Sequence, residues 1–163
     1  MGARNYEELG ENLQLISKRL LANKNLVKWL YYTDKDPLNG ADLTDTQIQS
    51  EVFEKLIRIV PRVGPKETAH STVVIEVMDG TPDKTNGEFQ ELKIVVESFV
   101  PLTQWIVKNK SLRPFLIMSE INKSLNGKTI NGLGKIKNEG FVLNFLTEEI
   151  SSYKQVYTIK AYD

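Results

Sequence analysis

The sequence predicts a single α+β domain spanning residues 1–163, in which a mostly antiparallel β-sheet is flanked by a long N-terminal helix and by a short helix between strands. Three patterns support this prediction. Apolar residues recur at helical spacing near the N-terminus. Two long segments rich in β-branched residues occupy the middle of the chain, and two segments with the alternation of strands lie near its end. We therefore expect a helical portion over residues 6–57 that packs on a β-rich portion over residues 58–163.

The segment from about Tyr6 to Tyr31 is predicted to be helical. Its apolar residues lie four and three positions apart and so share one stripe, formed by Leu9, Leu13, Ile16 and Leu20. Asn23 and Asn25 are the positions at which this helix is expected to be interrupted before Leu26. The following segment, from Thr33 to Gly40, is rich in turn-forming residues and predicts a loop.

A second helix is predicted to begin at Thr44, because Thr44 and Gln47 have the spacing of a capping box. This helix is expected to run to about Leu56. The segment from Arg58 to Val63 predicts a short strand. Pro61 would confine that strand to an edge of the sheet, because proline has no N–H to donate to a ladder.

The middle of the chain predicts a β-hairpin. Residues from Ser71 to Met78 are rich in β-branched side chains, with Val73, Ile75 and Val77 on one face. Residues from Gln90 to Val100 form a second strand, whose side chains alternate between two faces. The polar turn from Thr81 to Asn86 joins the two strands. In the second strand one face carries Leu92, Ile94, Val96 and Val100, and the other carries Glu91, Lys93, Val95, Glu97 and Phe99. We expect the second of these faces to be exposed to solvent.

The remaining elements follow from periodicity and from turn residues. The segment Leu102–Lys110 fits either a helix or a loop. The other predictions are a short helix over Pro114–Leu125 that ends before Gly127, a loop or hairpin over Asn126–Lys135, and strands over Phe141–Phe145 and Val156–Tyr162.

Composition excludes several classes of function. Lysine plus arginine equals aspartate plus glutamate, so the formal net charge is zero, whereas a protein that neutralises many phosphates usually has a basic excess. The chain has no cysteine, which rules out disulfides and thiolate chemistry. It also lacks an apolar stretch long enough to cross a bilayer and the apolar core of a signal peptide. We expect a soluble protein made in the cytoplasm, without a cofactor.

The segment from Thr81 to Lys93 contains the residue pattern of a PD-(D/E)xK nuclease, with Asp83 followed by Glu91 and Lys93. Such a site binds Mg²⁺ through carboxylates and uses the lysine to orient or activate the attacking water. Glu91 and Lys93 are two positions apart, so they share one face of a strand. Further carboxylates that could complete the site are Asp79, Glu76 and Glu97. A small Mg²⁺-dependent nuclease is therefore the alternative hypothesis, although Asp83 falls within a predicted turn.

Trp29, Tyr31 and Tyr32 form an aromatic cluster at the end of the N-terminal helix. Tryptophan and tyrosine are enriched as anchors at protein interfaces, and they also fill cores. Consecutive residues of a helix cannot all face one way, so at least one of Leu30, Tyr31 and Tyr32 must point away from the apolar stripe. Core packing and a protein contact surface both stay open for this cluster.

The order of the predicted elements resembles that of the tail-terminator and neck (head–tail connector) proteins of tailed bacteriophages. The segment LLANKNLVKWLYYTDKDPL is similar to the opening of phage neck proteins, with a helix, aromatic residues and a turn that contains Asp34, Asp36, Pro37 and Leu38. The segment SLRPFLIMSEINKSLNGKTINGLGK is similar to the region in which those proteins place a short helix before their last strands.

This resemblance implies a structural virion protein without catalytic residues, made in the host cytoplasm. It would form a homo-oligomeric ring, commonly of six subunits, at the junction of head and tail. Its partners would be the phage tail tube and head-completion proteins, with no small-molecule substrate and no membrane. The polar turn would then serve as a contact arm through Asp83, Lys84, Thr85 and Asn86, beside a contact surface at the aromatic cluster.

Overall fold

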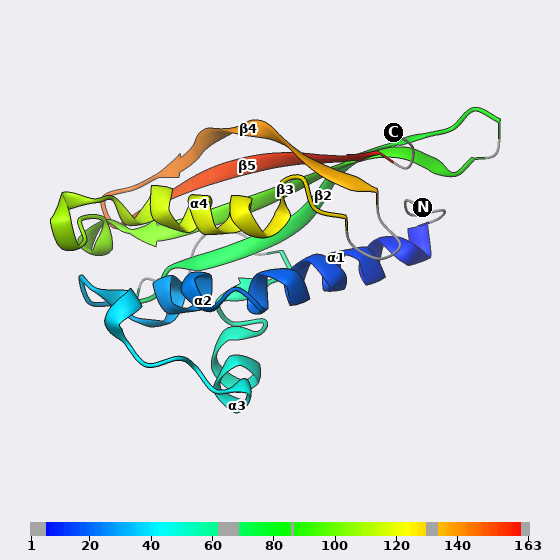
Figure 1. Cartoon of the computed structure of the whole chain (residues 1–163). Helices are drawn as coiled ribbons and strands as arrows, with labels where there is room; N and C mark the ends of the chain where they lie inside the picture. Colours follow the sequence, from blue (N-terminus) through cyan, green and yellow to red (C-terminus); the bar gives the residue numbers. More distant parts are fainter. Residues whose placement is uncertain (1–5, 62–68, 86, 130–133, 161–163) are drawn as a thin grey trace.

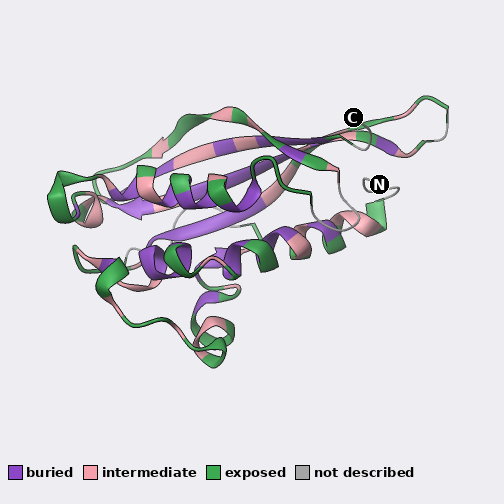
Figure 2. Cartoon of the chain, viewed as in Figure 1, coloured by how far each residue is buried: buried purple, intermediate pink, exposed green. Residues whose placement is uncertain are grey.

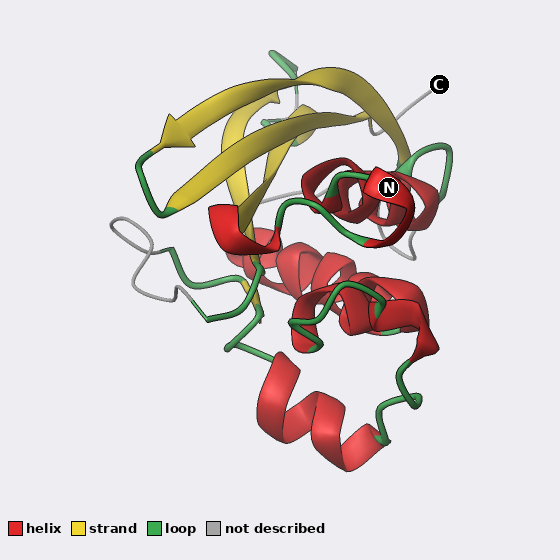
Figure 3. Cartoon of the chain, turned by 90° about the vertical axis from the view of Figure 1, so that its left-hand side faces the viewer, coloured by secondary structure: helices red, strands yellow, loops and turns green. Residues whose placement is uncertain are grey.

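The protein folds as a curved β-sheet with its three main helices on one face, as Figures 1 and 3 show. A computed structural model describes residues 6–61, 69–85, 87–129 and 134–160. The α+β class is confirmed, with four α-helices and a five-stranded, mostly antiparallel sheet in the described residues. No helix in these described ranges is long and apolar enough to span a membrane.

The N-terminal helix is divided at Asn23, as the sequence predicts. Helix α1 spans Tyr6–Leu21 and helix α2 spans Lys24–Tyr31. The side-chain oxygen of Asn23 caps α2 by accepting a hydrogen bond from the backbone N–H of Leu26 at 3.0 Å. Asn25, by contrast, lies inside α2 and does not interrupt it.

Asn23 also ties the helical layer to the helix between strands. Its side-chain amide donates to the hydroxyl of Ser124 at 2.8 Å and to the backbone oxygen of Glu120 at 3.1 Å. Both partners lie on α4, which spans Arg113–Leu125. One side chain therefore starts α2 and fixes its position against α4.

We expect Asn23→Ala to lower the free energy of unfolding by about 1–2 kcal/mol, because the variant loses a helix cap and the hydrogen bonds to α4. Denaturant titration would measure this loss. Asn25→Ala is the matched control, since Asn25 is exposed on the same helix. Equal losses in the two variants would contradict the role assigned to Asn23.

The second predicted helix is shorter than expected. The capping box is present: the Thr44 hydroxyl accepts from the Gln47 N–H, and the Gln47 side chain accepts from the Thr44 N–H. Helix α3 spans Asp45–Gln47 and continues as one π-helical turn over Ile48–Val52. The chain turns at Glu54, which has a left-handed φ of 57°, so the helix does not reach Leu56.

The sheet has the strand order β1-β2-β3-β5-β4. Strand β1 spans only Ile57–Arg58, at an edge, whereas the sequence predicts Arg58–Val63; residues 62 and 63 lie outside the described part. The other strands are longer than predicted: β2 spans Thr72–Pro82, β3 Phe89–Pro101, β4 Lys135–Leu146 and β5 Ile150–Lys160. Strand β1 is parallel to β2, and the other three pairs are antiparallel.

The core lies between the sheet and the helices. The predicted apolar faces of β2 and β3 point into it, with Ile75 and Val96 fully buried against residues of α1, α2 and α4 such as Leu20, Leu30 and Ile117. The segment Leu102–Lys110, left open by the sequence, contains two 3₁₀ turns, over Leu102–Gln104 and Lys108–Lys110.

The second face of β3 is more buried than the sequence predicts. Val95 and Glu97 are both buried, and Glu97 is only 8% exposed. A carboxylate can be buried when its oxygens are hydrogen-bonded. Here one carboxylate oxygen of Glu97 accepts from the Asn144 side-chain amide at 2.7 Å and from the Ser152 hydroxyl at 2.6 Å. The expectation of a solvent-facing strand is therefore wrong at this end of β3.

Candidate interaction sites

The aromatic cluster at the end of α2 has one buried and two partly exposed members. Trp29 is 6% exposed and belongs to the core. Tyr31 and Tyr32 are half-buried, and their rings meet edge to face with centroids 5.1 Å apart. A contact surface in this region would therefore use the two tyrosines and not Trp29.

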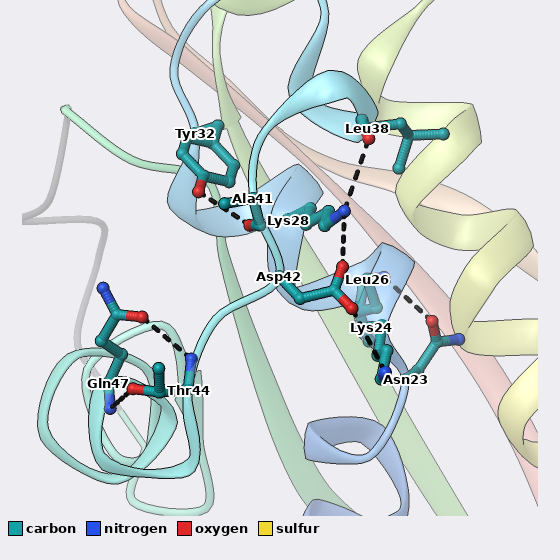
Figure 4. Close-up of polar contacts among 10 residues, drawn as sticks. All are labelled: Asn23, Lys24, Leu26, Lys28, Tyr32, Leu38, Ala41, Asp42, Thr44 and Gln47. Atoms are coloured by element: carbon teal, nitrogen blue, oxygen red, sulfur yellow. Dashed lines mark hydrogen bonds and ion pairs between the residues drawn. The ribbon is translucent and has the colours of Figure 1, made fainter.

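The loop after α2 fixes the ring of Tyr32. The Tyr32 hydroxyl donates to the backbone oxygen of Ala41 at 2.8 Å, as Figure 4 shows. Gly40 lies directly against the ring, because a Cβ added there would be 2.5 Å from a ring carbon of Tyr32. A side chain at position 40 would have to displace the Tyr32 ring, whereas the backbone of Gly40, with a φ of −66°, is accessible to any residue.

The same loop is attached to α2 by charge. The Asp42 carboxylate lies 2.8 Å from the Lys28 ammonium and 3.2 Å from the Lys24 ammonium (Figure 4). The Lys28 ammonium also donates to the backbone oxygen of Leu38 at 3.4 Å. These contacts hold the loop across the outer side of α2, beside the two tyrosines.

The pair of lysines lowers the pKa of Asp42 below its ordinary value of 3.8, chiefly through the hydrogen bond from Lys28 and then that from Lys24. A carboxyl whose folded pKa is lowered contributes stability that is present above pH 3.8 and is lost as the pH falls through the folded pKa. We expect Asp42→Asn to be less stable than the wild type at pH 7. Thermal unfolding should show this difference shrinking towards zero in strong acid, and a difference independent of pH would contradict the ion-pair assignment.

Arg113 connects the aromatic cluster to the rest of the domain. Its side chain is fully buried, and its guanidinium lies 5.5 Å from the centre of the Trp29 ring. It donates to the backbone oxygens of Trp29 at 2.7 Å, Tyr32 at 2.8 Å and Gln104 at 3.1 Å, and also to that of Asp34. Burial lowers the pKa of Arg113 to about 10, so the group stays charged at neutral pH.

Arg113 is a residue that sequence reasoning missed. In the sequence it stands before Pro114 as one of several surface-compatible basic residues, and nothing local signals burial. Its partners come from the end of α2, the loop that follows and the turn Leu102–Gln104, so the signal exists only in the tertiary structure. The arginine sets the positions of the segments that carry Tyr31 and Tyr32.

Tyr31 faces a small pocket of about 280 Å³ with mixed charge. The pocket is lined by Tyr31, Glu51, Glu54, Lys55, Leu56, Arg58 and His70. The Tyr31 and His70 rings are 6.4 Å apart. The volume is slightly below the usual range of small-molecule sites, and both signs of charge line the pocket. These features suit a contact with a polar protein surface.

The polar turn lies at the tip of the β2–β3 hairpin, which extends past the other strands in Figure 1. Lys84 and Thr85 are exposed, and Asn86 lies outside the described residues. The Asp83 carboxylate accepts from the Thr85 N–H at 2.6 Å and also from the Gln90 side chain. Asp83 therefore takes part in the turn itself, and the exposed side chains beside it are available for contact.

The base of the hairpin is supported by α1. Phe89 and Leu92 are buried together against Leu9, and the rings of Tyr6 and Phe89 meet edge to face with centroids 5.3 Å apart. This small apolar cluster lies apart from the main core. The hairpin arm is therefore fixed at its base and exposed at its tip.

Glu91 and Lys93 share a face of β3, as the nuclease hypothesis requires. In the sheet Lys93 is opposite Asp79 on β2, and Glu91 is opposite Lys160 on β5. The Glu91 carboxylate lies 3.8 Å from the Lys160 ammonium. Asp83 lies beyond this ladder, in the turn. In the described ranges no three histidine, cysteine or carboxylate side chains are grouped closely enough to hold a metal ion.

The model of a protein family described as YomW matches residues 23–159, which include α2, the loop after it, the hairpin, α4 and both C-terminal strands. No curated protein matches the chain.

Proposed function

The chain belongs to the YomW family, named after a gene product of a Bacillus phage region, which indicates a phage-associated protein, and on this premise we propose that it is a structural virion protein of a tailed phage. In this proposal it forms an oligomeric ring at the head–tail junction, as a tail terminator or a neck protein. It acts through contacts with other copies, with the tail tube and with head-completion proteins.

The observation that carries this proposal is the hairpin arm. Its two strands extend past the body of the domain (Figure 1), its tip displays Lys84 and Thr85, and its base is fixed by α1. An arm that is fixed at its base loses little conformational entropy on binding, because its backbone is already ordered before it meets a partner. Such an arm suits the repeated contacts of a ring protein with its neighbours.

The proposal is tested in phage particles. We expect the protein in purified virions, and we expect a phage that lacks its gene to accumulate heads and tails that are not joined, as seen by electron microscopy. Wild-type protein supplied from a plasmid should restore joined particles. Absence from virions, together with normal particles in the deletion phage, would overturn the proposal.

The arm is tested in the same assay. Plasmid-borne protein with Lys84→Ala and Thr85→Ala should restore fewer joined particles than the wild type. The matched control carries Gln49→Ala and Ser50→Ala, two exposed positions on the π-helical turn away from the hairpin. If both variants restore joined particles equally well, the arm does not take part in joining heads to tails.

The nuclease alternative makes a separate prediction. A PD-(D/E)xK enzyme should cleave plasmid or branched DNA in the presence of Mg²⁺, and Lys93→Ala should abolish that cleavage. We expect wild-type protein and the Lys93→Ala variant to leave DNA equally intact. Cleavage by the wild type alone would establish the nuclease and replace the ring proposal.

A further inference from the structure

Three lysines surround a pocket at the edge of the sheet, beside the segment that follows α4. Lys135 and Lys137 lie on β4, and Lys160 is the last residue of β5. All three side chains line one pocket of about 450 Å³, a volume within the usual range of small-molecule sites. No carboxylate is among the described residues that line this pocket, so the charge of its lining is positive.

The strand register places the three lysines on one face of the sheet. Lys135 is opposite Lys160, and Lys137 lies two residues further along β4. Side chains two positions apart on a strand share a face, and opposite side chains of an antiparallel pair have Cβ atoms about 5 Å apart. Ile136, between the two lysines of β4, points the other way and is buried in the core. The rest of β4 is mostly exposed (Figure 2), so like charges lie close together on an open surface.

The segment after α4 forms one side of this pocket. It runs along the outer edge of β4, where the Gly127 N–H donates to the Ile136 oxygen at 2.7 Å. The Ile136 N–H donates in turn to the Lys128 oxygen at 3.0 Å. Asn126 also lines the pocket, and its side-chain oxygen accepts from the Asn138 N–H at 2.9 Å. Its side-chain N–H₂ donates to no described residue and is therefore a further donor at the pocket.

The three ammoniums have no hydrogen-bond acceptor among the described residues. Lys137 lies 3.8 Å from the Glu139 carboxylate and Lys160 lies 3.8 Å from that of Glu91, distances too long for a hydrogen bond. Lys135 has no ion pair within the described ranges. The other ion pairs there are shorter, from 2.8 to 3.2 Å. Each of the three ammoniums therefore keeps its three donors for a ligand.

Glu139 shows the combined effect of these charges. Its carboxylate accepts from the Thr158 hydroxyl at 2.8 Å, and this hydrogen bond is the main cause that lowers its pKa below the ordinary 4.5. The charges of Lys137, Lys160 and Lys93 lower the pKa of Glu139 further. Lys93 is opposite Thr158 on β3, so a fourth lysine extends the cluster across the sheet. A negative charge at this place is stabilised by several lysines at once.

The chemistry of the pocket fits phosphate groups. Lysine binds phosphate as a point charge, whereas bidentate recognition of a carboxylate is characteristic of arginine, and no described residue that lines the pocket is an arginine. A terminal phosphate also presents three acceptor oxygens and about two charges, more than a carboxylate does. No described lining residue is aromatic, so the pocket has no surface on which a base would stack. Recognition of this kind depends on charge and not on base sequence.

We propose that the pocket formed by Lys135, Lys137 and Lys160 binds a polyanion through its phosphate groups, either a condensed phosphate or a short stretch of nucleic-acid backbone. Asn126 donates a further hydrogen bond from the segment after α4. The zero net charge of the chain argues against a protein that covers many phosphates, but a site of this size neutralises only a few. The site goes beyond the ring function proposed above and does not rest on it.

Two phosphate probes and one carboxylate probe test the ligand class. Isothermal titration calorimetry of the wild type with inorganic triphosphate should show one site per chain. Citrate should bind at least about fivefold more weakly, because it carries fewer charges and no phosphate oxygens. Fluorescence anisotropy of a short labelled DNA duplex measures the second source of phosphate. Binding of triphosphate alone would identify a condensed phosphate as the ligand, and binding of the duplex would identify nucleic-acid backbone.

Substitution of two lysines tests the position of the site. Lys135→Gln with Lys137→Gln should weaken the binding of the phosphate probes about tenfold. For the duplex, the slope of log affinity against log salt concentration should also decrease in magnitude by about two, because two phosphate contacts are lost. Lys135→Arg with Lys137→Arg keeps both charges, and its affinity should stay within about threefold of the wild type.

A matched control removes the same charge elsewhere. Lys18→Gln with Lys35→Gln alters exposed lysines on α1 and in the loop after α2, and it should bind both phosphate probes as the wild type does. Circular dichroism spectra identical to the wild type would establish that every variant is folded. Three results would each overturn the proposed site: a wild type that binds neither phosphate probe, equal affinities for citrate and triphosphate, and equal losses in the control and in the Lys135 and Lys137 glutamine variant.

Discussion

Replacing Arg113 by alanine should lower the free energy of unfolding by about 3–5 kcal/mol. The fully buried guanidinium donates to four backbone oxygens, at Trp29, Tyr32, Asp34 and Gln104. Removing it takes the donor away from one buried and three part-buried oxygens, and an unsatisfied buried polar group costs about 1–3 kcal/mol. The Trp29 carbonyl belongs to the last turn of α2, where the helix dipole also favours a positive charge.

Two comparison variants separate the causes of that loss. Arg113→Lys keeps a positive charge but loses the planar group that reaches several oxygens at once, so it should recover only part of the stability. Arg58→Ala removes a half-exposed arginine that also donates to backbone oxygens, those of Glu54 and Val60, and should cost less than about 1 kcal/mol. Equal losses at positions 58 and 113 would show that burial is not what makes Arg113 important.

The Arg113 variants also bear on the candidate contact surface. The arginine holds the end of α2 and the loop residues Tyr32 and Asp34 in place. We therefore expect Arg113→Lys to change both the tyrosine fluorescence and the rate at which a protease cleaves the loop after α2. These changes should occur under conditions in which the domain as a whole is still folded. An unchanged rate of loop cleavage would limit the arginine to a role in overall stability.

Leu20→Ala should destabilise the protein by about 2–5 kcal/mol, the range found for leucine deletions in closely packed cores. Leu20 has no exposed surface and lies on α1 within the main core cluster. Leu38→Ala is the control, because it removes the same atoms from an exposed side chain on the loop after α2. Denaturant titration of both variants should show a large shift in midpoint for the first and a small one for the second.

This substitution also tests whether α1 belongs to the same folding unit as the rest. The family match begins at residue 23, after the end of α1. If α1 and the sheet unfold together, Leu20→Ala should lower a single cooperative transition without adding a second one. A separate early transition, with the main midpoint unchanged, would make α1 an appendage of the domain.

Most of the secondary structure could be predicted because its signals are local. The spacing of Leu13, Ile16 and Leu20 places α1 against the core, and the Thr44–Gln47 box starts α3 where expected. The alternation in β3 identifies its core face. Each of these signals lies within a few residues and needs no knowledge of the rest of the chain.

Boundaries were predicted less well, since tertiary contacts extend or stop an element. Strand β4 continues far beyond Phe141–Phe145 because β5 supplies hydrogen-bond partners along its length. The second helix stops early because the chain must turn at Glu54 to place Ile57 beside Val73. Propensity is a weak guide at such points.

Local signals in the sequence are enough to predict the α+β class, the order of the elements, the face that β2 and β3 turn to the core, and the division of the N-terminal helix at Asn23. Contacts between distant segments bury Trp29 while Tyr31 and Tyr32 stay partly exposed, and they let Arg113 join segments about 80 residues apart. They also place β4 at an edge of the sheet, where Ile136 is hydrogen-bonded to Gly127 and Lys128. The two kinds of feature differ in the distance along the chain over which their causes act. Periodicity and capping act over one or two turns of chain, whereas the burial of a charge and the exposure of an edge depend on which distant segments meet.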